Sequence, residues 1–291
     1  MPSGEVTDFP TGGWISHRHE PVRAVEHWPG LWHPVAADWT LSVVIPAYNE
    51  EERILPTLRE YIGALSARQI RFEILVVFDG TDRTPEVVRS LNDRRVAVAE
   101  FREKLGRGGA IFEGLRRVHG DIIAYADADG SVGATDLVHL VDLVARDDLV
   151  AIASRRLDPT RVVVPETRAR RFVGGVWHAL IKALLGVRVK DVQCGLKVFR
   201  RSVVEMLVRE VAVTNRTFEV DLVYHLGRHG IPIDEVAVAY RHDFRTRMPI
   251  TKAVPVMFLF LVGVFLANNR VGRRVVPQHV FERVNAVFST T

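Results

Sequence analysis

The chain has 291 residues and a formal net charge of +4, and 47% of its residues are hydrophobic and 25% charged. A chain of this size and composition buries a large core, as expected of a single-domain soluble or peripheral enzyme. Its only cysteine, Cys194, excludes an intramolecular disulfide and fits a reducing compartment, and we predict a small buried side chain there rather than a nucleophile. The basic charge alone permits a nucleic-acid partner, but no helix-turn-helix, zinc or aromatic-repeat signature supports one, so we predict none.

Residues 1–39 differ from the rest of the chain. They carry four tryptophans scattered among prolines and glycines without a clear period, at Trp14, Trp28, Trp32 and Trp39. The start has no basic-then-apolar signal-peptide pattern, and the histidines of this stretch lack the second cluster that a metal site needs. We predict an extended arm that packs on the following domain through its tryptophans.

Two buried strands are predicted next, and both end in polar residues. The apolar run 41–45 is stopped by Pro46 and followed by an acidic helix start at Glu50 and Glu51. The run 72–78 ends in the polar turn 79–82, which begins with Asp79 and Gly80. Ligands of an open parallel α/β sheet bind at the carboxyl ends of the strands, so these polar ends indicate a ligand site.

A glycine-rich segment, Gly106-Arg107-Gly108-Gly109-Ala110, comes before a helix that we predict over 110–118. Glycines at the start of a helix let the backbone approach a bound phosphate closely. The alternative is a loop and helix cap that binds nothing.

The tetrapeptide Asp127-Ala128-Asp129-Gly130 follows the apolar run 122–126. Side chains two residues apart in a strand point to the same side, so we expect the two carboxylates to converge at the end of the strand. Mg²⁺ and Mn²⁺ prefer oxygen ligands and commonly take one or two protein carboxylates, leaving other positions to water and substrate phosphate. The pair therefore indicates a Mg²⁺ or Mn²⁺ site at Asp127 and Asp129 that serves a diphosphate, although acidic pairs also end many loops that bind no metal.

The rest of the core alternates between helices and strands. Helices are predicted near 135–144 and over 166–185, a strand near 149–154 and an edge strand over 231–240. This order predicts an α/β fold with a mostly parallel sheet flanked by helices. Arg168, Arg170 and Arg171 crowd the first turns of the second helix, where the helix dipole disfavours cations. A nearby anion would relieve that cost, and a solvated basic face is the alternative.

Six motifs in this order resemble those of family 2 glycosyltransferases, with dolichyl-phosphate glucosyltransferases the most similar branch and dolichyl-phosphate mannose synthases next. The motifs lie at 44–50, 79–80, 106–110, 127–130, 153–155 and 191–197. The resemblance runs from about residue 40 to about residue 248 and implies the Rossmann-like glycosyltransferase-A fold. The chain departs from the family at Phe78, which stands where the first of two aspartates is usual, and its turn at 79–82 is one residue short. Both departures bear on how base and ribose are recognised.

The resemblance, together with the charges, also implies roles for individual residues. Metal ligation falls to Asp127 and Asp129. Donor binding falls to Pro46, Ala47, Tyr48, Glu50, Asp79, Gly106, Arg107, Gly108, Asp127 and Arg155. Catalytic roles fall to Asp129, Arg155, Lys197, Asp191 and Glu219. Contacts to an acceptor phosphate fall to Arg155, Arg171, Lys197, Arg245 and Arg247.

The nature of the acceptor decides which of these groups are needed. Sugar transfer leaves negative charge on the nucleotide diphosphate, which a metal on Asp129, supported by Asp127, would neutralise. A lipid phosphate is already anionic and needs cations to position it rather than a base. A hydroxyl acceptor needs a base to take its proton, and the candidates are Asp191, Glu219, Asp221 and, less strongly, His242. Family 2 enzymes invert at the anomeric carbon, so the resemblance implies one in-line displacement.

The segment 249–291 contains an apolar run at 253–267, which is shorter than the roughly twenty residues needed to span a bilayer. Basic residues flank it on both sides, at Arg245, Arg247, Lys252, Arg270, Arg273 and Arg274. We predict a helical segment that lies on an anionic membrane surface, with a buried helix as the alternative. The expected location is the cytoplasm, peripheral at the cytoplasmic membrane face.

The chain is thus expected to comprise an arm at 1–39, a catalytic domain at 40–248 and the C-terminal segment. The predicted function is inverting transfer of a hexose, from UDP-glucose or else GDP-mannose, to a polyprenyl phosphate of the dolichyl type. One alternative is a soluble glycosyltransferase acting on a small hydroxyl acceptor such as a glycerate derivative. Another is a non-catalytic nucleotide-sugar-binding protein, against which the intact Asp127, Asp129 and Arg155 argue.

Overall fold

The structure is a computed structural model that describes residues 39–147, 150–164, 168–211 and 218–241. Nearly all of the predicted N-terminal arm and all of the segment 249–291 lie outside the described residues, as do His242, Arg245 and Arg247. Arg171 lies in a described helix, but its side chain is outside the description.

A seven-stranded sheet in the order β3-β2-β1-β4-β7-β5-β8 forms the centre of the described chain, and β6 and β9 pair separately. The strands are β1 Thr40–Ala47, β2 Arg71–Phe78, β3 Val96–Glu100, β4 Ile122–Tyr125, β5 Val150–Ser154, β6 Val162–Val164, β7 Lys197–Arg200, β8 Ile233–Ala237 and β9 Tyr240–Arg241. The helices are α1 Ile54–Ala67, α2 Thr84–Arg89, α3 Gly106–Leu115, α4 Ala134–Asp147, α5 Arg168–Leu185, α6 Arg201–Glu210 and α7 Phe218–Arg228. Strand β7 is antiparallel to β4 and β5, and the other pairs in the large sheet are parallel.

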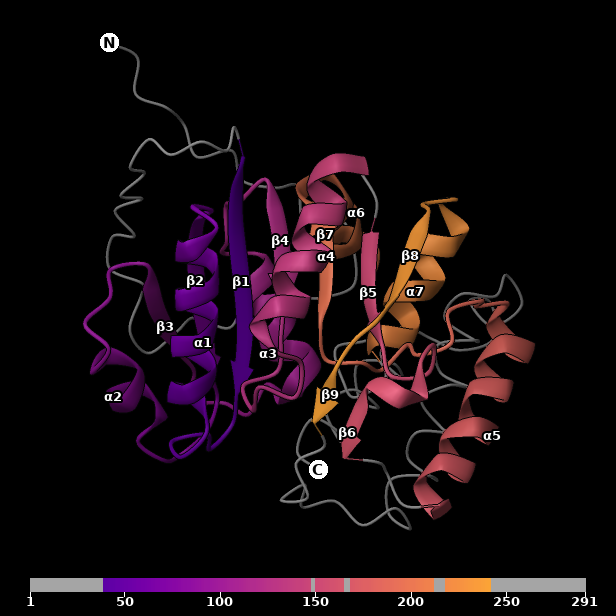
Figure 1. The fold of residues 1–291 in the computed structure, drawn as a ribbon, viewed down its shortest axis with the longest axis horizontal. Coiled ribbons are helices and arrows are strands. Elements are labelled where there is room, and N and C mark those ends of the chain that lie inside the picture. Colours follow the sequence, from indigo (N-terminus) through magenta and orange to yellow (C-terminus); the bar gives the residue numbers. More distant parts are fainter. Residues whose placement is uncertain (1–38, 148–149, 165–167, 212–217, 242–291) are drawn as a thin grey trace.

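Helices cover both faces of this sheet (Figure 1). The core on one face joins the sheet to α1 and α4, and the core on the other face joins it to α3, α5, α6 and α7. Strand β1 contributes to both, because Val43 and Ile45 belong to the first core and Val44 to the second. Alternating side chains that are all buried are expected of a parallel strand between two helical layers.

The predicted α/β fold with a mostly parallel sheet is confirmed, and the differences are local. Helix α3 begins at Gly106 rather than at residue 110, and the strand predicted over 231–240 ends at Ala237, with Tyr240 in the separate strand β9. Asp127 and Asp129 are not part of the strand, on whose side-chain alternation their expected convergence was based. Strand β4 ends at Tyr125, opposite Val44 of β1, and both aspartates lie in the loop beyond it.

The membrane prediction rested on the segment outside the described residues. Among the helices that are described, none is both long and apolar enough to cross a bilayer.

Gly114 tests how closely α3 packs on the sheet. A Cβ at this position would lie 2.3 Å from Cγ1 of Val44 and 3.1 Å from Cγ2 of Val77. We expect Gly114→Ala to lower the free energy of unfolding by about 1–3 kcal/mol, because an added methyl group overpacks the core. Urea unfolding measures the change.

Gly63→Ala in α1 is the matched control, since nothing lies within 4 Å of a Cβ there. Alanine is favoured over glycine in a helix by about 1 kcal/mol, so this variant should be at least as stable as the parent. A Gly114 variant that also keeps the parent's stability would contradict the close contact between α3 and β1.

Candidate active site

The predicted site residues gather where β1, β2 and β4 end. These strands are neighbours and parallel, so the segments that follow them, 48–53, 79–83 and 126–133, emerge at the same edge of the sheet. Strand β3 is parallel to β2 and leads to the start of α3 at this edge. Ligands of open α/β sheets bind at the carboxyl ends of the strands.

The loops after β1 and β2 are held together by Asn49, which the sequence analysis did not single out. Its side-chain Oδ1 accepts hydrogen bonds from the backbone N–H groups of Thr81 at 2.8 Å and Asp82 at 3.3 Å. Asn49 has a φ of 57°, a conformation that asparagine tolerates better than most residues. A Cβ on Gly80 would lie 2.5 Å from Asn49 Oδ1, so the loops approach this closely only with glycine there.

Asp79 fixes the glycine-rich segment rather than facing solvent. Its side chain is buried, and Oδ2 accepts a 2.8 Å hydrogen bond from the backbone N–H of Gly106. Burial raises the pKa of Asp79, while the N–H groups of Gly106 and Leu105 oppose that rise. Gly106 has a φ of 67°, the left-handed conformation that glycine adopts readily. Asp79 thus fixes the start of α3 at the strand edge.

Tyr48 is the exposed aromatic side chain of this edge. It follows Pro46 and Ala47, the last two residues of β1, and 47% of its surface is exposed. The ammonium of Lys104 lies 4.8 Å from the centre of its ring, within the range of a cation–π interaction.

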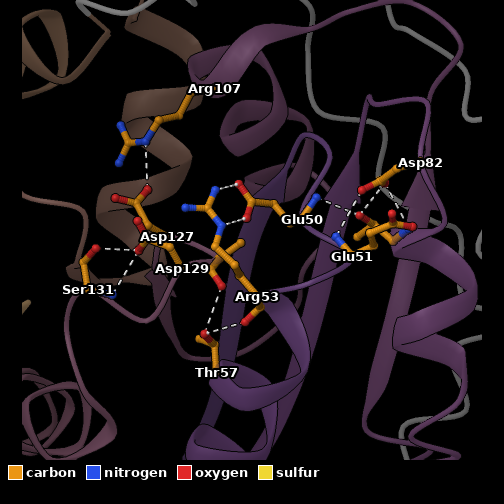
Figure 2. Close-up of polar contacts among 11 residues, drawn as sticks. Glu50, Glu51, Arg53, Thr57, Asp82, Arg107, Asp127, Asp129 and Ser131 are labelled. Atoms are coloured by element: carbon orange, nitrogen blue, oxygen red, sulfur yellow. Dashed lines mark hydrogen bonds and ion pairs between the residues drawn. The ribbon is translucent and has the colours of Figure 1, made fainter. Parts of the chain in front are cut away.

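The acidic loop after β4 is fastened to α1. Thr57 Oγ1 donates a 2.9 Å hydrogen bond to the carbonyl of Ala128, and Tyr61 donates one of 2.9 Å to the carbonyl of Val132. Within the loop, Oδ1 of Asp129 accepts hydrogen bonds from the backbone N–H and the hydroxyl of Ser131, at 2.9 and 2.6 Å (Figure 2). The orientation of Asp129 is therefore set before any ligand binds.

Three carboxylates share this region. Burial raises the pKa of Asp129, and the negative charge of Asp127 raises it further. Burial also raises the pKa of Glu50, partly offset by Arg53, whose Nε and Nη2 bind the two Glu50 carboxylate oxygens at 2.8 and 2.6 Å (Figure 2). A divalent cation would reduce the electrostatic repulsion among the carboxylates of Glu50, Asp127 and Asp129.

The donor set suits a hard cation that is only partly coordinated by protein. Asp127, Asp129 and Glu50 offer carboxylate oxygens, which Mg²⁺ and Mn²⁺ prefer. Among the described residues, no group of three or more histidine, cysteine, aspartate or glutamate side chains is arranged to hold a metal. The residues therefore fit an ion that takes one or two carboxylates and completes its shell with water and phosphate oxygens.

Arg107 connects the acidic loop to α7. Its Nε donates a 2.8 Å hydrogen bond to Oδ1 of Asp127, and its Nη1 pairs with Oε1 of the buried Glu219. The guanidinium also lies 6.0 Å from the ring centre of Tyr125 and 5.9 Å from that of Phe218. Burial disfavours its charge, but the two carboxylates outweigh burial and hold the pKa of Arg107 well above its ordinary value.

Gly195 closes the other side of Asp127. A Cβ at this position would lie 2.0 Å from Asp127 Oδ2, so the segment before β7 can pass beside the carboxylate only with glycine there. Arg107 thus contacts one oxygen of Asp127, and the backbone of Gly195 lies close to the other.

Arg155 and Asp191 form a second buried pair. The Nε and Nη2 of Arg155 bind the two carboxylate oxygens of Asp191 at 2.7 and 2.8 Å, and the Arg155 backbone N–H adds a bond of 2.9 Å. The Arg155 guanidinium lies 5.0 Å from the ring centre of Tyr240. Burial alone would raise the pKa of Asp191, but Arg155 outweighs burial and holds it below its ordinary value.

The other predicted site residues lie inside the protein or outside its described part. Lys197 is fully buried, donates a 2.9 Å hydrogen bond to the carbonyl of Cys194 and lies 5.2 Å from the ring centre of Tyr125. Burial lowers its pKa, with Glu219 opposing the change. Asp221 is fully buried, with Oδ1 at 3.4 Å from Nε2 of His225. In this structure Lys197 therefore contacts protein groups and does not reach solvent.

A comparison with protein families matches residues 42–208 to the family described as glycosyl transferase family 2. The chain belongs to this family. It is a family 2 hexosyltransferase, as the six motifs predicted.

Sequence relatives of this family 2 enzyme include two dolichyl-phosphate β-glucosyltransferases. The protein of Homo sapiens is 30% identical over 260 residues, which cover 82% of this chain and 79% of the relative. The protein of Drosophila melanogaster is 32% identical over 216 residues, which cover 69% of this chain and 66% of the relative.

Among solved structures, the glucosyl-3-phosphoglycerate synthase of Mycobacterium tuberculosis shares the fold. A complex of that enzyme with Mn²⁺, UDP-glucose and phosphoglyceric acid superposes with a TM-score of 0.54 and 19% identity, covering 88% of this chain and 89% of the other. This likeness supports the glycosyltransferase-A architecture.

The Arg155–Asp191 pair generates a stability prediction. We expect Asp191→Asn to lower the free energy of unfolding at neutral pH by about 3–5 kcal/mol, because it leaves the Arg155 charge buried without its partner. Since the pKa of Asp191 is depressed in the folded state, the pair's contribution is complete above the ordinary aspartate pKa of about 4 and is lost as the pH falls through the folded pKa. The difference between parent and variant should therefore shrink in acid.

Asp93→Asn is the control for this experiment. Asp93 also pairs with an arginine, Arg95 at 2.7 Å, but on the more exposed surface, where such pairs contribute at most about 1 kcal/mol. Urea unfolding at several pH values measures both variants. Equal losses of unfolding free energy in the two variants at neutral pH would show that the buried Arg155–Asp191 pair contributes no more than a surface pair.

Proposed function

We propose that this enzyme moves a hexose, with inversion, from a nucleotide-diphosphate sugar to a polyprenyl phosphate. UDP-glucose is the favoured donor and GDP-mannose the alternative. The donor would lie along the edge formed by Pro46, Ala47, Tyr48, Glu50 and Asp79 and by the start of α3 at Gly106, Arg107 and Gly108. The acceptor phosphate would approach from the side of Arg155.

The burial of the three carboxylates that were candidate bases carries this choice of acceptor. A hydroxyl acceptor must give up its proton, and the three carboxylates that were candidates to take it are buried, with exposed fractions of 2% for Asp191, 1% for Glu219 and 0% for Asp221. Asp191 and Glu219 are also held by arginines. A phosphate monoester is anionic near neutral pH and attacks without such a base.

The similarities support the same acceptor. Three sequence relatives at 28–32% identity are dolichyl-phosphate β-glucosyltransferases. The alternative, a small hydroxyl acceptor such as a glycerate derivative, is supported by the solved phosphoglycerate synthases, which are only 18–20% identical. We place the enzyme at the cytoplasmic membrane face, because a polyprenyl acceptor is confined to a membrane, and assign contact with anionic lipid to the C-terminal segment.

The proposed reaction is a single displacement. A phosphate oxygen of the acceptor attacks the anomeric carbon as the bond from that carbon to the diphosphate breaks, giving a β-linked product from an α-linked donor. Asp129, supported by Asp127, would hold a Mg²⁺ or Mn²⁺ ion, which stabilises the charge left on the diphosphate. Asp191 keeps the Arg155 guanidinium in one orientation, so that it can position the incoming phosphate without first being ordered. In the described conformation Lys197 is buried, so its role in the reaction would be indirect: its positive charge lies beside Glu219 and Tyr125.

Asp129→Asn tests the role of the metal. We expect kcat to fall by about 100- to 1,000-fold, because one lost electrostatic contact to a developing charge has effects of this size. The thermal unfolding temperature should change little. Initial rates of hexose transfer with and without Mg²⁺ or Mn²⁺ provide the measurement.

Asp142→Asn provides the matched control, because Asp142 pairs with Arg68 on the surface between α1 and α4. It should leave the rate and the metal dependence unchanged. Parent-like turnover by Asp129→Asn, or turnover of the parent that needs no divalent ion, would contradict the metal assignment.

The acceptor is tested by offering two classes of it to the same enzyme. With UDP-glucose or GDP-mannose, we expect turnover with a polyprenyl phosphate and none with 3-phosphoglycerate, since the three candidate carboxylate bases in the described part of the chain are buried. Asp221→Asn should retain an appreciable rate for the same reason, whereas Arg155→Lys should raise the KM for the acceptor. Turnover of 3-phosphoglycerate that Asp221→Asn abolishes in a folded protein would replace the polyprenyl-phosphate proposal with the soluble-acceptor one.

A further inference from the structure

A second polar pocket lies behind the Arg155–Asp191 pair. It is a small, partly open pocket between α5 and the segment 190–193. Its polar lining consists of Arg156, Trp177, His178, Lys190, Asp191 and Gln193. Arg155, Asp127 and Asp129 do not line it, so it is distinct from the proposed donor and metal site.

A buried hydrogen-bond donor without a partner belongs to this pocket. Trp177 is only 9% exposed, and its indole N–H forms no hydrogen bond within the described part of the chain. Leaving such a donor buried and unpaired costs free energy. A ligand oxygen in the pocket would remove that cost.

The same pocket also contains two cations. Arg156 and Lys190 both line the pocket, and neither side chain forms an ion pair with another described residue. The Arg156 guanidinium rests against the backbone of α5, since a Cβ on Gly174 would lie 2.7 Å from Arg156 Nη2. Gly174 is one helical turn before Trp177 and His178, so the guanidinium and the indole belong to the same side of α5.

The carboxylate oxygens near the pocket already accept hydrogen bonds from other protein groups. Both oxygens of Asp191 bind Arg155, and both oxygens of Glu235 accept backbone N–H groups, from Lys190 at 2.9 Å and Asp191 at 2.8 Å. The pocket therefore offers donors from Arg156, Lys190 and Trp177, while the carboxylates near it already bind protein N–H groups. Such a lining favours an oxygen-rich anion over a neutral sugar, which needs both donors and acceptors.

His178 adds a group whose protonation responds to an anion. Burial lowers its pKa, and the charges of Arg156 and Lys182 lower it further, while Glu235 and Asp191 oppose them. Its imidazole is thus mostly neutral at neutral pH, and a bound anion would make protonation easier.

We propose that this pocket is a binding site for a phosphate monoester, held by Arg156, Lys190 and the indole N–H of Trp177. The phosphate belongs either to a soluble metabolite or to the headgroup of a membrane lipid. Because Asp191 borders both this pocket and Arg155, an occupant lies one side chain away from the proposed acceptor position. The proposal requires no sugar transfer and is tested by binding alone.

The test is a titration of the full chain with inorganic phosphate, followed through the indole ¹⁵N–¹H signals. Trp177→Phe identifies the signal of Trp177 among those of the five tryptophans. We expect that signal to shift saturably and the pKa of His178 to rise. Arg156→Gln should weaken binding about tenfold, the size expected for a lost charged hydrogen bond. Arg188→Gln, which removes an exposed charge that does not line the pocket, should leave binding unchanged.

Two neighbouring glycines provide a second, charge-neutral comparison. Gly174→Ala would displace the Arg156 guanidinium, whereas nothing lies within 4 Å of a Cβ on Gly175. We expect Gly174→Ala to weaken phosphate binding and Gly175→Ala to preserve it, with both variants folded by circular dichroism. An effect of the same size in both would overturn the assigned position of Arg156.

Competition then distinguishes the two sources of phosphate. Displacement of inorganic phosphate by vesicles of phosphatidylcholine with phosphatidic acid, but not by phosphatidylcholine alone, identifies a lipid headgroup. Displacement by soluble 3-phosphoglycerate and not by the vesicles identifies a metabolite. No saturable shift of the Trp177 signal, or equal weakening by Arg156→Gln and Arg188→Gln, overturns the proposal.

Discussion

The active edge depends on the balance of buried charge around Arg107. Asp127 and Glu219 lie in separate parts of the chain, and the buried Glu219 would face a large desolvation cost without an opposite charge. Arg107 contacts both, so that one guanidinium from the start of α3 joins the loop after β4 to α7. Arg107 and Gly195 hold Asp127 from two sides, and Ser131 holds one oxygen of Asp129. The position of the acidic tetrapeptide therefore depends on α3 and on the segment before β7.

The reversed strand β7 supplies the other half of the site. In a parallel sheet only the segments that follow the strands reach the carboxyl edge. Since β7 runs antiparallel to β4 and β5, the segment that precedes it reaches this edge instead. That segment carries Asp191, which orients Arg155, and Gly195, which packs on Asp127. The antiparallel direction of β7 thus places the segment that precedes it at the carboxyl edge, between the ends of β4 and β5. If β7 were parallel to its neighbours, this segment would lie at the opposite edge of the sheet.

Much of this arrangement could be predicted from the sequence, because strand ends and glycine-rich helix starts have local signals. The polar turns after β1, β2 and β4 were placed correctly by their apolar runs. The partners of individual side chains were not, since the pairing of Arg107 with Glu219, 112 residues apart, depends on tertiary packing. Lys197 was predicted to meet the acceptor because it is a cation in a motif, yet it begins a short central strand and is buried there. Asn49 was overlooked because its role depends on a left-handed backbone conformation.

The same charges explain why a site for two anionic substrates would need a divalent ion. Three arginines at the edge, Arg53, Arg107 and Arg155, are each paired with carboxylates, and the acids near them are Glu50, Asp127, Asp129, Asp191 and Glu219. These eight side chains carry a formal charge of −2, so the arginines alone would not attract a diphosphate. One divalent cation cancels that charge, and it would do so beside Asp129, where burial and Asp127 already raise the pKa of the carboxyl. With such an ion bound, the arginines would act mainly to hold the acids in place, and the ion would attract the phosphate groups.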